Sequence, residues 1–85
     1  MENINETLAK RLVQHGPFHK HARIEDNLRH ILEVYGDRLS TVQEIGLGMI
    51  MHKIARILNG GHRQSDTWQD IAGYAILAEQ EILNE

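Results

Sequence analysis

The chain has 85 residues, which is enough for one small domain, and we predict a single domain over residues 1–85. It has no cysteine, which excludes disulfide frameworks, thiolate zinc sites and cysteine nucleophiles. Nine basic and twelve acidic residues give a net charge of −3, and this balance argues against direct binding of nucleic acid. No apolar segment approaches the roughly 20 residues of a membrane span. The first residues also lack a signal-peptide pattern, so we expect a cytoplasmic protein with no membrane partner.

A chain of this size can form only a modest hydrophobic core. A compact globule of this length has a radius of gyration of roughly 12 Å and buries about 60–65% of its unfolded surface. Small proteins without disulfides or structural metals often gain stability by oligomerising. We therefore expect a homo-oligomer.

Two helices are predicted in the first half of the chain. The apolar periodicity over residues 4–15 ends at Gly16-Pro17, because a proline disfavours the helical conformation of the residue before it. Pro17 can then be the first residue of a second helix, which Gly36 ends. The apolar stripe of this second helix consists of Ile24, Leu28, Ile31, Leu32 and Tyr35.

The third predicted helix is apolar on almost every side between residues 45 and 51. Such a helix lies at the centre of a bundle or at a subunit interface. Gly46 and Gly48 within it indicate that neighbouring helices approach closely. The helix ends at Asn59-Gly60-Gly61. Two pairs fit the capping-box pattern at its start, Ser40 with Gln43 and Thr41 with Glu44.

A polar loop over residues 62–65 precedes the fourth predicted helix, for which Asp66 or Thr67 can provide the cap. Gly73 within this helix again indicates close packing by a neighbour. The predicted buried face consists of Trp68, Ile71, Ala72, Ala75, Ala78 and Ile82. No strand pattern occurs in the sequence. The fold class is therefore all-α, a small four-helix bundle with mostly antiparallel neighbours.

Six histidines are the unusual feature of the composition, and His15, His19 and His21 lie close together around Gly16-Pro17. A metal site would need one or two of them with ligands from other helices. The candidates for those further ligands are His52, Asp66 and Asp70. Neither H-E-x-x-H nor a paired E-x-x-H motif occurs. We therefore expect surface histidines or hydrogen bonds at helix ends, and no functional metal.

A charged cluster is predicted at the hairpin between the third and fourth helices. Lys53 and Arg56 end one helix, and Asp66 and Asp70 begin the next. The four side chains are interpreted either as an inter-helix salt-bridge network or as a polar pocket. In a pocket, the cations would hold a phosphate or carboxylate, and the aspartates a base, a ribose or a metal.

Two aromatic residues lie next to this cluster. Trp68 is one turn into the fourth helix, and Tyr74 follows later on the same helix. A single tryptophan at helical spacing is usually a core anchor whose indole N–H finds one partner. The alternative is that either ring stacks on a nucleobase.

Three segments together resemble a family of small phage and prophage proteins. They are H-G-P-F at residues 15–18, followed by Ala22, K-I-A-R-I-L-N-G at residues 53–60 and D-T-W-Q-D-I-A-G-Y-A at residues 66–75. The match spans residues 12–78. This family is similar in layout to the MazG-like nucleoside triphosphate pyrophosphohydrolases, in which a helical E-E-x-x-E and a later E-x-x-D hold magnesium.

The sequence departs from the hydrolase pattern in its carboxylates. Asp66 and Asp70 would stand near the second motif, but they are four residues apart instead of three. The first motif is absent, and Glu44 is the single carboxylate that the third helix offers. Magnesium catalysis needs several converging carboxylates. A MazG-like hydrolase with Mg²⁺ is therefore the alternative, and we expect no cofactor and no catalytic residue otherwise.

The resemblance implies a phage accessory protein that acts by binding. It would be either an anti-defence or host-interaction protein with a host protein as partner, or a sponge-like oligomer that sequesters a nucleotide. A purely structural assembly component is a further alternative. The candidate ligand-binding residues are His15, Lys53, Arg56, Asp66, Trp68, Asp70 and Tyr74.

Overall fold

A computed structural model describes residues 3–85, which fold into four α-helices with no strand in this range. A five-residue turn, η1, continues the third helix into the following loop, and its backbone leaves helical geometry at Asn59 and Gly60. The elements are α1 (Ile4–His15), α2 (Phe18–Tyr35), α3 (Thr41–Arg56), η1 (Ile57–Gly61) and α4 (Ser65–Leu83). The prediction of an all-α protein with four helices is confirmed. None of the described helices is long and apolar enough to cross a membrane.

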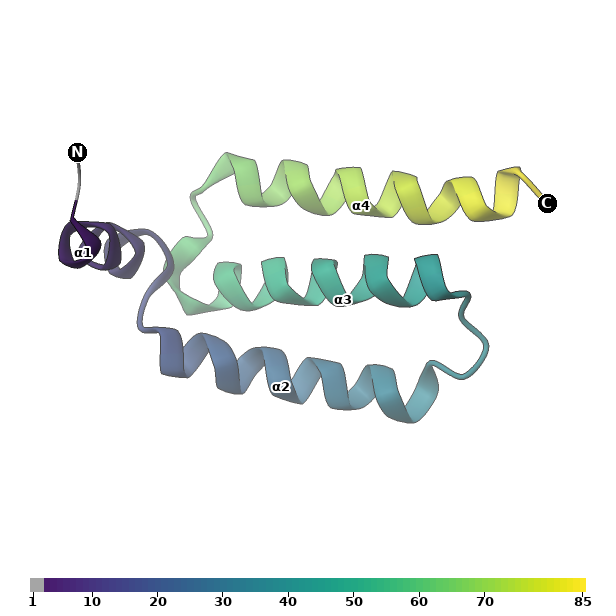
Figure 1. Cartoon of the computed structure of the whole chain (residues 1–85), viewed down its shortest axis with the longest axis horizontal. Helices are drawn as coiled ribbons and strands as arrows, with labels where there is room; N and C mark the ends of the chain where they lie inside the picture. Colours follow the sequence, from purple (N-terminus) through teal and green to yellow (C-terminus); the bar gives the residue numbers. More distant parts are fainter. Residues whose placement is uncertain (1–2) are drawn as a thin grey trace.

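Three of the helices form a single antiparallel layer (Figure 1). α3 lies between α2 and α4, as its apolar surface predicts, and α1 crosses the end of the layer where α2 begins and α3 ends. The radius of gyration is 14.8 Å and the extents are 46 × 25 × 22 Å. The value of about 12 Å expected for a compact globule is too small, because helices of 16 to 19 residues lie side by side instead of enclosing a core.

The helix starts follow local capping chemistry. The capping box of α3 is formed by Ser40 and Gln43, with hydrogen bonds of 3.1 and 3.0 Å, and this alternative is confirmed. Pro17 is the residue before α2 and not its first helical residue. The predicted caps of α4 are wrong, because the helix begins at Ser65 after Gln64. Asp66 and Thr67 therefore already lie inside the first turn of α4.

Two glycine-containing segments pack against each other where α1 meets the layer. Gly16 has φ 74° and ψ −176°, a conformation that is essentially restricted to glycine. A Cβ atom at this position would overlap the carbonyl oxygen of Asn59. The side-chain amide of Asn59 donates a 2.8 Å hydrogen bond to the carbonyl of Pro17. The H-G-P and N-G-G segments are thus one structural unit that holds α1 in place.

The contact between α3 and α4 covers only part of the apolar surface of α4. A Cβ atom at Gly46 would lie 3.6 Å from the Cβ of Ala78, so the predicted close approach of these helices is confirmed. A Cβ atom at Gly73 would meet nothing within 4 Å among residues 3–85, so the close neighbour predicted there is wrong.

The predicted buried face of α4 is wrong for four of its six residues, because α4 packs mainly on one neighbour, α3. Ile71, Tyr74 and Ala78 are partly buried on this side of α4, and Thr67 is buried there. The outer members of the predicted face are exposed, and they are Trp68, Ala72, Ala75 and Ile82. The predicted apolar stripe of α2 is also only partly buried. Ile24, Leu28 and Leu32 are partly buried, whereas Ile31 and Tyr35 are exposed.

Candidate functional site: a basic cleft beside a histidine–glutamate network

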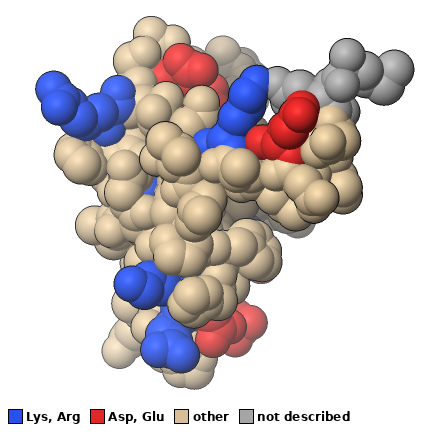
Figure 2. All heavy atoms as spheres, turned by 90° about the vertical axis from the view of Figure 1, so that its left-hand side faces the viewer, with Lys and Arg blue, Asp and Glu red and all other residues tan. Residues whose placement is uncertain are grey.

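A cleft of about 420 Å³ lies where α1 crosses the end of the layer. Apolar side chains form much of its wall, among them Leu8, Leu12 and Phe18. Figure 2 looks onto this end of the molecule, where most of the surface belongs to residues other than Lys, Arg, Asp and Glu. The polar lining residues are Arg11, His15, His21, His52 and Arg56. We call this cavity the basic cleft.

The charges that line the basic cleft all have one sign. It contains two arginines and no carboxylate, although the chain as a whole has a net charge of −3. Within residues 3–85, neither Arg11 nor Arg56 forms an ion pair with an acidic side chain. A guanidinium without a carboxylate partner is available to bind an anionic group through two parallel N–H···O hydrogen bonds, that is, in bidentate geometry. The electrostatics of the basic cleft therefore favour an anionic ligand.

His15 contributes an uncharged ring to the wall of the basic cleft. Burial lowers the pKa of His15, and the nearby Arg56 cation lowers it further, so the ring is neutral at neutral pH. Its Nδ1 atom is buried and has no hydrogen-bond partner in the described part of the chain. Buried polar atoms in folded proteins are nearly always hydrogen-bonded, so this nitrogen is an exception within the site.

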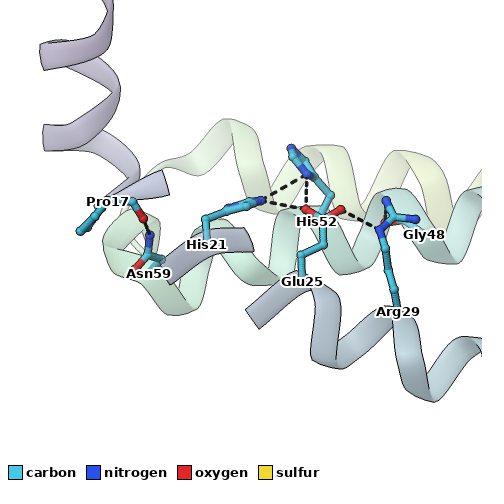
Figure 3. A network of polar contacts seen from close by, with 7 residues as sticks. All are labelled: Pro17, His21, Glu25, Arg29, Gly48, His52 and Asn59. Atoms are coloured by element: carbon cyan, nitrogen blue, oxygen red, sulfur yellow. Dashed lines mark hydrogen bonds and ion pairs between the residues drawn. The ribbon is translucent and has the colours of Figure 1, made fainter. Parts of the chain in front are cut away.

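A polar network joins α2 to α3 beside the basic cleft (Figure 3). Oε1 of Glu25 lies 2.8 Å from Nε2 of His21 and 2.6 Å from Nδ1 of His52. The two ring nitrogens are 3.3 Å apart. A second cleft, of about 360 Å³, borders this network and shares His21 and His52 with the basic cleft. The network therefore lies between two solvent-accessible clefts.

The other carboxylate oxygen of Glu25 is held by Arg29. The Nε atom of Arg29 donates to Oε2 at 2.7 Å, and its Nη2 atom donates to the carbonyl of Gly48 at 3.3 Å. Burial by itself would raise the pKa of Glu25. The hydrogen bonds from Arg29, His21 and His52 outweigh this effect and lower the pKa to about 2. Glu25 is therefore a carboxylate throughout the neutral range.

The charged cluster predicted at the hairpin is divided by the structure. Lys53 forms an ion pair of 2.9 Å with Asp70, which links α3 to α4. This contact is the salt bridge that one of the two interpretations expects. Arg56 lies instead on the wall of the basic cleft, together with His15. Asp66 is exposed in the first turn of α4 and joins neither group in the described ion pairs.

The two aromatic candidates lie away from the basic cleft. The indole N–H of Trp68 donates a 2.9 Å hydrogen bond to the carbonyl of His62, so the side chain fixes the loop before α4. About half of the Trp68 side chain remains exposed. Tyr74 is partly buried on α4, where its carbonyl oxygen would lie 3.7 Å from a Cβ at Gly46.

Among the residues of these clefts, sequence reasoning did not select Arg11 or Glu25, and it considered His21 and His52 only as possible metal ligands. A signal existed for two of them, because His21 and Glu25 are four residues apart on one helix and so share a face. Their pairing with His52, 27 positions after Glu25, depends on how α3 is rotated and has no local signal.

Comparisons with known proteins place the chain in a family without assigning it a function. Searches of curated proteins and of solved structures return no match. The profile of a family described as a domain of unknown function, DUF6378, matches residues 3–82. This match covers nearly the whole of the four-helix unit. The chain therefore belongs to the DUF6378 family.

Proposed function

We propose that the protein binds a small anionic ligand of the nucleotide class in the basic cleft. The observation that carries this proposal is the pairing of Arg11 and Arg56 with an apolar wall that has no acidic lining residue. A nucleotide combines a phosphate anion with a planar, largely apolar base. The arginines suit the phosphate, and the exposed ring of Phe18 suits the base.

In this proposal the protein acts by sequestering its ligand and not by transforming it. The resemblance to phage proteins gives the setting, the cytoplasm of an infected host, where a bound nucleotide signal would be withheld from a host defence pathway. Direct binding of a host protein is the alternative within the same class of function. The residues assigned to the ligand are Arg11, His15, Phe18 and Arg56.

A thermal-shift scan against nucleoside mono- and triphosphates and cyclic di- and trinucleotides, with and without Mg²⁺, tests the proposal. A ligand at a hundred times its Kd adds about 2.7 kcal/mol to the free energy of unfolding. Such a gain raises the Tm of a domain of this size by roughly 10 °C or more. We expect Arg11→Ala and Arg56→Ala each to weaken binding by about 10- to 100-fold.

Arg38→Ala is the matched control, because Arg38 is exposed in the loop between α2 and α3, at the end of the layer opposite the cleft. It should leave the affinity unchanged. Recovery of the nucleotide intact supports sequestration, whereas Mg²⁺-dependent release of pyrophosphate supports the MazG-like alternative. A scan in which no nucleotide raises the Tm contradicts the nucleotide proposal.

We further propose that the functional unit is a homo-oligomer formed through the outer stripe of α4. The chain exposes 6627 Å². A folded monomer of 9.8 kDa exposes only about 5,200 Å². The excess of about 1,400 Å² exceeds the roughly 800 Å² that each partner buries in a typical interface. The exposed apolar side chains on this stripe are Trp68, Ala72, Ala75, Ile76 and Ile82, and Glu79 is the charged residue among them.

Sedimentation equilibrium tests the oligomer. We expect the wild-type chain to sediment as a dimer or higher oligomer at micromolar concentration, and Ala75→Glu to shift it to the monomer by burying a charge in the interface. Leu77→Glu is the control, because Leu77 is exposed on the opposite side of α4. A wild-type chain that sediments as a monomer, or an equal effect of both variants, contradicts this assignment.

A further inference from the structure

We propose that His21, Glu25 and His52 form a binding site for one divalent transition-metal ion of the Zn²⁺ type. The three side chains each offer one ligand atom, and these atoms all lie within 4.8 Å of one another. The sequence offers His21 and His52 as possible metal ligands but leads us to expect no functional metal, and it does not point to Glu25. The proposal does not depend on nucleotide binding, because it rests on a different set of atoms and is tested with the metal alone.

The distances between the ligand atoms are close to those of a tetrahedral metal site. Zn–N bonds of about 2.0–2.1 Å place two tetrahedral ligands about 3.3 Å apart. Nε2 of His21 and Nδ1 of His52 are 3.3 Å apart. Oε1 of Glu25 lies 2.8 and 2.6 Å from these nitrogens, which are hydrogen-bond distances. A movement of Oε1 by roughly 0.8 Å away from both rings, through rotation of the Glu25 side chain, would give all three atoms metal-ligand spacing.

The chemistry of the three ligands selects the type of metal. Two imidazole nitrogens and one carboxylate oxygen form a donor set typical of Zn²⁺ and of other divalent first-row transition metals. Mg²⁺ prefers oxygen ligands in an octahedral arrangement, so this group does not suit it. Three protein ligands leave at least one coordination position open. His21 and His52 line both clefts, so the open position is accessible to water or to a ligand.

The scaffold holds the three ligands from two helices and supports the carboxylate from behind. His21 and Glu25 lie one turn apart on α2, and His52 faces them from α3. Arg29 binds Oε2 of Glu25 and leaves Oε1 directed at the two rings. Outer hydrogen bonds of this kind orient metal ligands, and their loss typically weakens metal binding 10- to 100-fold. The hydrogen bond from Arg29 to the Gly48 carbonyl fixes this arrangement across the two helices.

Titration of the metal-free protein with ZnCl₂ tests the site, with binding monitored by calorimetry and by NMR of the histidine rings. We expect one equivalent of Zn²⁺ to bind, and the ring resonances of His21 and His52 to shift while those of the other four histidines do not. Because this measurement uses the wild-type chain, it does not depend on whether a variant folds. Substitution with Co²⁺ should give the intense visible absorption of a tetrahedral site.

Variants then assign the ligands. His52→Ala and Glu25→Gln should each weaken Zn²⁺ binding at least tenfold, with circular dichroism confirming the helical fold. His19→Ala and His30→Ala are matched controls, because both side chains are exposed on α2 and should leave the affinity unchanged. The proposal is overturned if Zn²⁺ does not bind, if ring shifts spread over His19, His30 and His62, or if the controls weaken binding as much as the site variants.

Discussion

Replacing Gly16 with alanine should lower the free energy of unfolding by roughly 2–4 kcal/mol. Gly16 has φ 74° and ψ −176°, which a residue with a Cβ atom adopts only at considerable cost. The added Cβ would also overlap the carbonyl oxygen of Asn59, and a backbone atom cannot rotate away as a side chain can. The contact that holds α1 against η1 would therefore open, and the wall of the basic cleft with it.

Chemical denaturation followed by circular dichroism measures this effect. Gly73→Ala is the matched control, because the same Cβ at that position meets nothing within 4 Å in the described chain. It should raise the free energy of unfolding by up to about 1 kcal/mol, since alanine is the better helix former. Equal effects of the two substitutions would contradict the role assigned to the Gly16–Asn59 contact.

Acid should destabilise the metal-free protein by about 3 kcal/mol through Glu25 alone, because its pKa is about 2 in the folded chain and 4.5 as the ordinary value. A carboxylate whose pKa is lowered by folding stabilises the folded state fully above its unfolded pKa. That stabilisation is lost as the pH falls from about 5 to about 2. The loss is large for a small domain, whose total stability is only about 5–15 kcal/mol.

Urea unfolding at a series of pH values, with a chelator present, measures this linkage. Glu25→Gln should be less stable than the wild type at neutral pH and should lose the part of the acid dependence that belongs to this residue. Asp70→Asn is the control, because it removes a carboxylate that is half exposed and pairs with Lys53 outside the network. This variant should still lose, on acidification, most of the free energy of unfolding that the wild type loses. If Glu25→Gln keeps the full acid dependence, the hydrogen-bonded network does not stabilise the fold as described.

The fold was predictable because its signals are local. Gly16-Pro17, Gly36 and the Ser40–Gln43 capping box determine where helices end and begin, and each acts through its nearest neighbours. The start of α4 was predicted wrongly because its N-cap, Gln64, has no side-chain capping bond and so leaves no signal in the sequence.

The site was less predictable, because α3 is apolar on almost every side and its sequence does not determine which face meets which neighbour. Lys53 and Arg56 were grouped because they are three residues apart. In the structure, Lys53 pairs with α4, whereas Arg56 lines the cleft under α1. The meeting of Glu25 with His52 likewise depends on the rotation of α3 against α2. Only the three-dimensional arrangement brings these residues together.

The central claim is that a nucleotide-class anion binds in the basic cleft. Its most direct test is a ¹H–¹⁵N NMR titration of the wild-type chain with the nucleotide that gives the largest thermal shift. The account predicts that the amide shifts concentrate at Arg11, His15, Phe18 and Arg56. Shifts concentrated instead on the first two turns of α4, residues 65–72, or absent at saturating nucleotide would contradict it.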